Sequence, residues 1–278
     1  MKSFEPSCQA DLTTPIADRS AGARGSLIVN ADDWGRDRDT TNHILGCARH
    51  GTVSAASAMV FMDDSERSAA LAAEHRIETG LHLNFTTPYS ARMCPTALRD
   101  RQEQVGRYLL KHRLAQVMFH PGLATSFEYL VAAQLEEYRR IYGTSPERVD
   151  GHHHMHLSAN VLLQQLLPAG AIVRRSFHFE RGEKSALNRF YRKVVDHTLA
   201  QRHRLTDYFF SIEPLADSRV LKIYSLAQQH VVELETHPAV ADEHRYLMGS
   251  EMFRHLGDVR IMRPSAVTWT HAPQKDAL

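Results

Sequence analysis

The sequence predicts an α/β fold, a single domain of βα units around a parallel sheet with the size of one α/β barrel. Short β-branched and apolar runs alternate with longer helical patterns from residue 26 to residue 270, and this alternation is typical of βα units around a parallel sheet. The intervening stretch of about 240 residues is close to the size of one α/β barrel. No internal repeat or low-complexity linker divides it.

The elements follow one another in a regular order. The first helix carries Ile44, Leu45 and Ala48 on one face and stops at Gly51, which is typical of an amphipathic helix with a glycine cap. Strands are expected at 26–31, 53–60, 77–85, 148–151, 171–174, 208–212 and 231–235, and helices from about 40 to 51, 64 to 75 and 127 to 142.

The two ends of the chain differ from its centre. Residues 1–25 and 271–278 are polar and lack periodicity, so we expect a flexible leader and a tail flanking a barrel domain over 26–270. Acidic residues and prolines interrupt the amino terminus, which does not resemble a signal peptide. No apolar run approaches the roughly 18 residues of a membrane span. We therefore expect a cytoplasmic protein without integral membrane association.

Composition narrows the classes of partner and site. Lys and Arg number 33 against 32 for Asp and Glu, and this near balance provides no global field for nucleic acid, so we expect no nucleic-acid partner. Three widely spaced cysteines, with no CxxC pair, fit a reducing compartment and argue against a cysteine-based zinc site. Histidine is unusually frequent, at 18 residues against 14 glycines.

A local basic segment is the exception to this balance. Arg174 to Arg204 carries six more basic than acidic residues. A solvated helix face is the simpler interpretation. The alternative is a lid or groove wall that grips an acidic, nucleotide-linked or lipid-linked sugar.

The unusual polar residues stand where predicted strands end. The four clusters are Asn30–Gly35 (NADDWG), His82–Asn84 (HLN), Asp150–His156 (DGHHHMH) and Thr236–Pro238 (THP). In an α/β barrel the carboxyl ends of the strands converge on one face, where active sites are built. Four clusters that are distant in sequence are therefore expected to form one site.

Imidazole and carboxylate groups in such a site suit a divalent metal ion. Three protein ligands with open positions are typical of a catalytic centre, and a second carboxylate can accept a proton from metal-activated water. Because neighbouring side chains of a regular strand point to opposite faces, Asp32 and Asp33 are expected to do different jobs.

Single motifs of this kind also have simpler interpretations. An Asp-Asp pair is common at turns, and a lone histidine in an apolar strand is usually a core residue. Four histidines within five residues, at 152–156, are harder to explain that way. A non-heme iron oxygenase also uses two histidines and a carboxylate, and a catalytically silent sugar-binding module is the non-enzyme alternative.

The motifs resemble those of the YdjC-like carbohydrate deacetylases. NADDWG is similar to the family's NADDFG, GLHLNFT (80–86) to its GLHLNLT, VDGHHHMH (149–156) to its run of spaced histidines, and ELETHPA (233–239) to its late His-Pro-Gly. The resemblance extends over about residues 26–240. It implies an irregular (β/α) barrel that removes acetyl groups from N-acetylated sugars with one divalent metal ion, Mg or Zn first and Co or Mn as alternatives.

The resemblance also implies a role for each matching residue. Asp33, His82 and His152 would bind the metal, Asp32 would be the general base, and His237 would protonate the departing amine. Substrate binding or support of the site is implied for His154, His156, Asn84 and Trp34. The implied partner is an N-acetylated saccharide, and a homodimer is left open.

Overall fold

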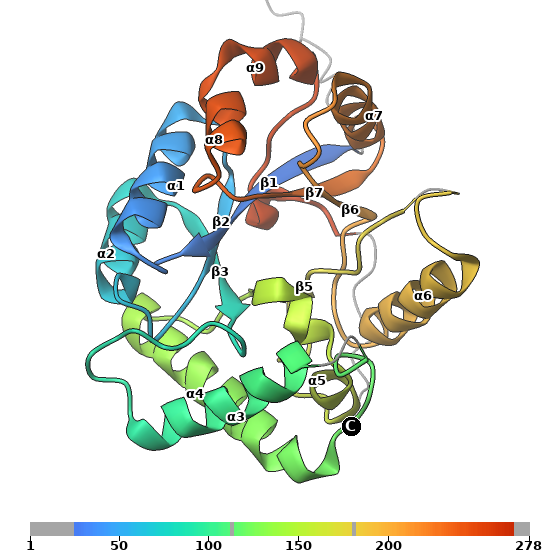
Figure 1. Cartoon of the computed structure of the whole chain (residues 1–278). Coiled ribbons are helices and arrows are strands. Elements are labelled where there is room, and N and C mark those ends of the chain that lie inside the picture. Colours follow the sequence, from blue (N-terminus) through green and yellow to red (C-terminus); the bar gives the residue numbers. More distant parts are fainter. Residues whose placement is uncertain (1–24, 112–113, 180–181, 270–278) are drawn as a thin grey trace, which may run out of the picture.

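The computed structural model describes residues 25–111, 114–179 and 182–269. Seven parallel strands form one sheet in the order β5-β4-β3-β2-β1-β7-β6, and the sheet curls into a half-barrel with helices outside it (Figure 1). The predicted α/β barrel class is confirmed. The expected leader and tail lie outside the described residues, except for Gly25.

The strands fall close to their predicted positions. They are β1 (Ser26–Trp34), β2 (Ala55–Ala58), β3 (Glu78–Leu83), β4 (Arg148–Gly151), β5 (Ile172–Val173), β6 (Tyr208–Ser211) and β7 (Val231–Thr236). Strand β1 runs three residues further than predicted, whereas β2 and β5 are shorter.

Helices connect the strands and cover the outside of the sheet. They are α1 (Arg38–His50), α2 (Ser65–His75), α3 (Thr96–Lys111), α4 (Ala124–Tyr142), α5 (Ala159–Leu163), α6 (Ala186–Ala200), α7 (Asp217–Ala227), α8 (Ala241–Met248) and α9 (Ser250–Leu256). Single 3-10 stretches occur at Pro121–Leu123, His152–Leu157 and Pro264–Ala266. The Asp37 side chain accepts a hydrogen bond from the Thr40 N–H, which fixes the start of α1.

Irregular chain bridges the two edge strands. Backbone N–H groups of Val173 and Arg204 donate to Arg204 and Ala171 oxygens, respectively, at 2.9 and 3.0 Å. The His178 N–H donates to the Phe209 oxygen at 2.9 Å. The first two bonds place the chain before β6 alongside β5, and the third places the chain after β5 alongside β6. Over the described ranges, irregular chain and not a further strand therefore connects the two edges of the sheet.

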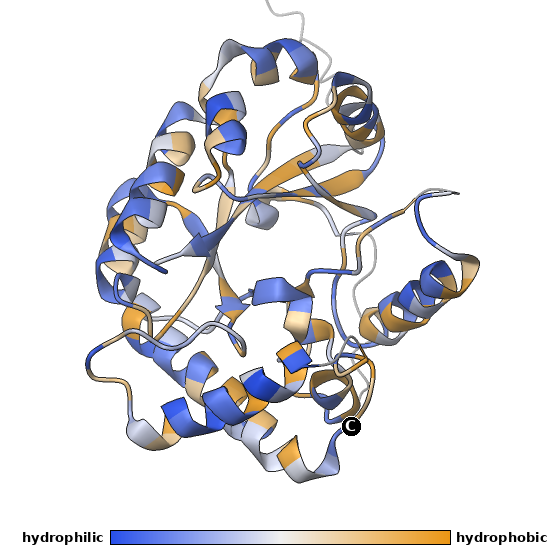
Figure 2. Ribbon diagram, viewed as in Figure 1, coloured by the Kyte–Doolittle hydropathy of each residue, from blue (hydrophilic) through white to orange (hydrophobic). Residues whose placement is uncertain are grey.

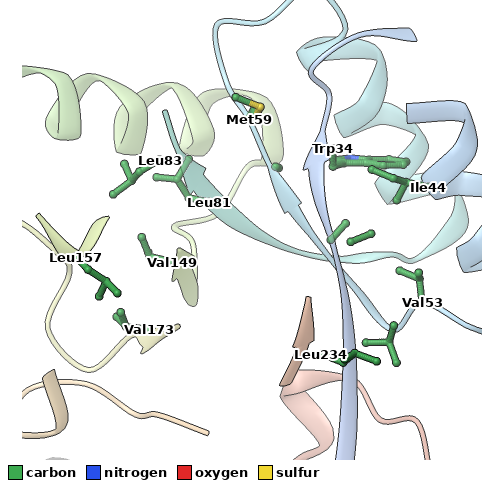
Figure 3. Packing of buried hydrophobic residues seen from close by; sticks show 14 of the residues in the cluster. Trp34, Ile44, Val53, Met59, Leu81, Leu83, Val149, Leu157, Val173 and Leu234 are labelled. Carbon is green, nitrogen blue, oxygen red and sulfur yellow. The ribbon is translucent and has the colours of Figure 1, made fainter. Parts of the chain in front are cut away.

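The core has an apolar outer layer and a polar interior. Trp34, Ile44 and Met59 pack between the sheet and its helices (Figure 3). Inside the curl, Arg174 and Glu233 are buried together with other charged side chains. Buried charges require partners, so the polar residues here are fixed in place by one another.

The described cysteines form no disulfide. Cys47 and Cys94 are free and buried, while Cys8 lies outside the described residues. Across the described part of the chain, no helix is both long enough and apolar enough to cross a bilayer.

Candidate active site

Strand β1 ends in a bulge that brings two consecutive aspartates to one place. The pairing register with β2 shifts between Ala31 and Trp34, and Asp33 is in the left-handed region with φ 69°. As a result His82 Nε2 lies 3.9 Å from Asp32 Oδ2 and 3.5 Å from Asp33 Oδ1. The expectation of regular strand geometry at this pair is therefore wrong, because a bulge re-aims side chains that a regular strand would separate.

The three predicted metal ligands meet at the carboxyl ends of β1, β3 and β4. Asp33 Oδ1 lies 3.0 Å from His152 Nδ1 and 3.5 Å from His82 Nε2, and the three ligand atoms are all within 4.8 Å of one another. Asp33 Oδ1 lies between these two imidazole nitrogens, and Arg36 Nη1 donates to the other oxygen, Oδ2, at 3.1 Å. One carboxylate oxygen and two imidazole nitrogens so close together are a donor set that fits a divalent metal ion.

Asp150 fixes the orientation of one of these histidines. Its Oδ1 lies 2.7 Å from His82 Nδ1, which directs Nε2 of the same ring toward Asp33. Burial by itself would lower the pKa of His82, but Asp32, Asp150 and Asp33 together raise it to about 10. The three carboxylates around His82 therefore stabilise the protonated, positively charged form of its ring.

Asp32 has a different environment from Asp33. The Arg174 guanidinium donates to both oxygens of Asp32 at 2.7 Å, and Asn30 Nδ2 donates to Oδ1 at 2.7 Å. Burial would raise the pKa of Asp32, but Arg174 and then His82 hold it well below its usual value. Asp32 is therefore an ionised carboxylate held in a fixed orientation.

Arg174 is an interior residue rather than part of a surface segment. It is fully buried and also donates to Glu233 at 2.8 Å and to Glu235 at 3.2 Å. The expectation that the whole stretch from Arg174 to Arg204 forms one solvated face or lid is wrong for this residue, because four carboxylates of the barrel interior, including Asp150 at 3.1 Å, lie around its guanidinium.

His237 lies close to Asp32 and Glu235. Ligand atoms of Asp32, Glu235 and His237 are within 4.8 Å of one another, and the His237 side chain is 35% exposed. Burial would lower the pKa of His237, but Glu243, Asp32 and Glu235 raise it to about 9. Its imidazole is thus protonated near neutral pH and can donate a proton.

Histidines of the 152–156 run separate into different roles. His154 Nε2 lies 3.5 Å from Glu235 Oε1, and its side chain is partly exposed toward the site. His156 is fully buried, and its Nε2 lies 2.9 Å from the backbone oxygen of Arg174. Burial lowers the pKa of His156 to about 4. Of the two predicted roles, substrate binding and support of the site, the second fits His156 better, because its ring contacts the backbone of Arg174.

Asn84 and Trp34 are fully buried. Asn84 Oδ1 accepts hydrogen bonds from the Thr86 and Thr87 N–H groups, which turns the chain after β3. Trp34 packs against Ile44 in the outer core (Figure 3). Both side chains are therefore buried beneath the site and not exposed in it.

The sequence motifs predicted no role for several charged residues of the barrel interior. Asp150, Arg148, Glu233 and Glu235 are buried and paired around Arg174 or His82. A signal was present in β7, where Glu233 and Glu235 flank Leu234 and therefore share one face of the strand. Two carboxylates on one face of a buried strand require an interior cation.

Comparisons with known proteins identify the family of this chain. A family model described as YdjC-like protein matches residues 26–268. Chitooligosaccharide deacetylases of Yersinia pestis (strain Pestoides F) and Yersinia pseudotuberculosis serotype O:1b (strain IP 31758) are each 30% identical over 228 residues, 78% of this chain and 83% of theirs. A solved structure from Enterococcus faecalis V583, titled as a candidate cellobiose-phosphate cleavage protein, shares the fold with a TM-score of 0.62 at 16% identity, covering 87% of this chain and 98% of that one. The chain belongs to the YdjC-like family.

Proposed function

We propose that this protein is a metal-dependent hydrolase that removes the acetyl group from an N-acetylated sugar. The observation that carries the proposal is the position of Asp32, whose carboxylate lies close both to His82 of the Asp33, His82 and His152 set and to His237. The 30% identity to chitooligosaccharide deacetylases supports a sugar amide as the substrate.

Asp33, His82 and His152 would hold one divalent metal ion. When bound, such an ion polarises a carbonyl and lowers the pKa of water from 15.7 to about 7. Two imidazole ligands favour zinc or cobalt over magnesium, which prefers oxygen ligands. Magnesium and manganese nevertheless belong in the test, because the third ligand is a carboxylate.

Asp32 would accept the proton of the attacking water. Arg174 and Asn30 keep its carboxylate ionised and aimed, which is the state a proton acceptor must have. Its low pKa makes Asp32 a weak base, so this proton transfer would depend on a bound metal ion that lowers the pKa of the water. The water oxygen forms the new bond to the acetyl carbon.

His237 would complete the reaction by donating a proton to the sugar nitrogen. As the carbon–nitrogen bond breaks, the electron pair stays on nitrogen, and the proton from His237 makes the amine a stable leaving group. Acetate and the free amino sugar are the products. Glu243, whose Oε1 lies 3.8 Å from His237 Nδ1, would keep the ring charged and oriented.

Acetate release from N-acetylglucosamine oligomers tests the proposal. We expect release by the metal-loaded protein, loss with a chelator, and recovery on adding back Zn, Co, Mn or Mg in separate arms. Asp32→Asn should retain metal but lose about 10² to 10⁴ in kcat, while the exposed Asp39→Asn should behave like wild type.

Two outcomes would contradict the proposal. Oligomer binding without acetate release in any metal arm would make the protein a silent sugar-binding module. Dioxygen consumption with Fe(II), in place of acetate release, would favour the iron oxygenase alternative.

A further inference from the structure

Helix α6 exposes an apolar stripe. Leu187, Phe190 and Val194 are 77%, 65% and 47% exposed, and Tyr191 is also exposed. Their spacing of three and four residues places them on one side of the helix. A lone exposed apolar side chain needs no explanation, but a contiguous stripe marks an interaction surface.

Little of α6 is used to hold it against the barrel. Its buried residues are Val195 and Leu199, both in the second half of the helix. In Figure 1 the beginning of α6 stands away from the sheet, and Figure 2 shows hydrophobic and hydrophilic segments alternating along it. The first half of the helix therefore presents its apolar side to the surroundings.

Cations lie on the polar side of α6, where three of them line a pocket together with Phe179 and Tyr208. Arg189 contacts the Lys184 oxygen and Arg192 contacts Asn188. Among the described residues, no carboxylate lies within ion-pair distance of Arg189, Arg192 or Lys193. The one acid of α6, Asp196, is already bonded to Arg175 at 2.8 Å. The polar side of α6 is therefore positively charged.

This surface lies at the catalytic end of the barrel. The His154 ring, in the candidate site, is 4.5 Å from the Phe177 ring, which is 6.1 Å from Phe179. The Arg192 guanidinium lies over Phe179 at 4.9 Å. A short chain of ring contacts thus leads from the site to the first half of α6.

We propose that the first half of α6 docks on an anionic lipid bilayer. An apolar side combined with a polar side rich in Arg and Lys is the composition of helices that lie in the membrane interface, and anionic headgroups supply negative charge for these cations. A second copy of the chain fits less well, because two-fold pairing of this face would bring the same cations of both copies together. The proposal does not depend on the deacetylase activity.

Vesicle co-sedimentation of the full-length protein tests the docking surface. We expect binding to equimolar phosphatidylglycerol and phosphatidylcholine vesicles, weak binding to phosphatidylcholine alone, and release as ionic strength rises. Val194→Glu and Phe190→Glu should each reduce binding about tenfold or more. Leu221→Glu on α7 is the matched control, since Leu221 is as exposed as Val194 at 47%, and it should bind like wild type.

Charge reversal provides a second, independent arm. Lys193→Glu should weaken binding to the anionic vesicles about tenfold, whereas Arg254→Glu, on the exposed surface of α9, should have a much smaller effect. Unchanged thermal unfolding and unchanged acetate release from a soluble oligomer would show that the variants are intact. Vesicle binding does not require catalytic turnover. A negative result in the vesicle test would therefore not contradict the deacetylase proposal, and a negative result in the acetate assay would not contradict membrane docking.

Two results would overturn the proposal. One is equal binding, or none, to anionic and neutral vesicles. The other is a dimer in analytical ultracentrifugation that Phe190→Glu converts to a monomer, because the stripe would then be covered by a second copy.

Discussion

Asp32 and Asp33 are neighbours in the chain, yet their carboxylates meet opposite surroundings. Asp32 receives two hydrogen bonds from Arg174 and one from Asn30, all at 2.7 Å. Asp33 faces two imidazoles with Oδ1 and accepts a hydrogen bond from the partly exposed Arg36 on Oδ2 at 3.1 Å. A fully buried arginine holds the Asp32 side of the site, whereas the Asp33 side has the donor set for a metal ion.

This difference explains how one barrel end can carry two carboxylates with separate roles. A guanidinium cannot be displaced from the interior, so Asp32 stays ionised and fixed whether or not metal is bound. The Asp33 side depends on what binds there. Stability is therefore expected to depend mainly on the Arg174 side, and metal affinity on the Asp33 side.

Removal of Arg174 should have the largest effect. Arg174→Met leaves the carboxylates of Asp32, Glu233 and Glu235 without their shared cation, and breaking a buried ion pair costs about 3–5 kcal/mol. Urea titration should show that loss in the free energy of unfolding. The exposed Arg107→Met should change it by less than about 0.5 kcal/mol. Equal effects of the two substitutions would show that the interior pairs add no stability.

The sequence predicted the strands and their polar ends because these depend on local pattern. The alternation at Glu233–Glu235 and the run at 152–156 can be recognised within one element. The role of Arg174 could not be found this way, since its partner Asp32 is 142 residues away. A charge run in sequence does not distinguish a solvated arginine from one that enters the barrel.

The local sequence pattern also could not predict that Asp32 and Asp33 both point toward His82. Regular strand geometry separates Asp32 from Asp33, and only the bulge with its left-handed Asp33 brings both toward His82. A left-handed aspartate is uncommon but tolerated. Such a departure from regular geometry at a site is typical of functional positions.

A smaller effect is expected from Asp150 on the metal side. Asp150→Asn weakens the acceptor that orients His82, and loss of such a partner typically lowers metal affinity about 10- to 100-fold. Competition with a chromogenic chelator for Zn measures this change. The exposed Asp258→Asn should keep wild-type affinity. If Asp150→Asn bound zinc as tightly as wild type while folding normally, His82 would not be a ligand oriented by Asp150.

The smallest effect concerns the pH dependence set by Glu243. The pKa of His237 is raised to about 9 from its usual 6.5, so the proton-donating form is complete near pH 7 and is lost as pH rises through about 9. We expect kcat to fall above that pH. Glu243→Gln removes the leading interaction that raises this pKa, and the fall should move down by about one pH unit, equivalent to about 1.4 kcal/mol.

A kcat profile from pH 6 to 11, measured with saturating oligomer and metal, checks this expectation. Glu251→Gln, an exposed substitution on α9, controls for the loss of one negative charge and should leave the profile unchanged. The direction of the shift is decisive. Loss of a catalytic base would make the rate fall toward acid pH, whereas loss of a protonated His237 makes it fall toward alkaline pH. An alkaline fall that does not move in Glu243→Gln would assign the proton donor to another group.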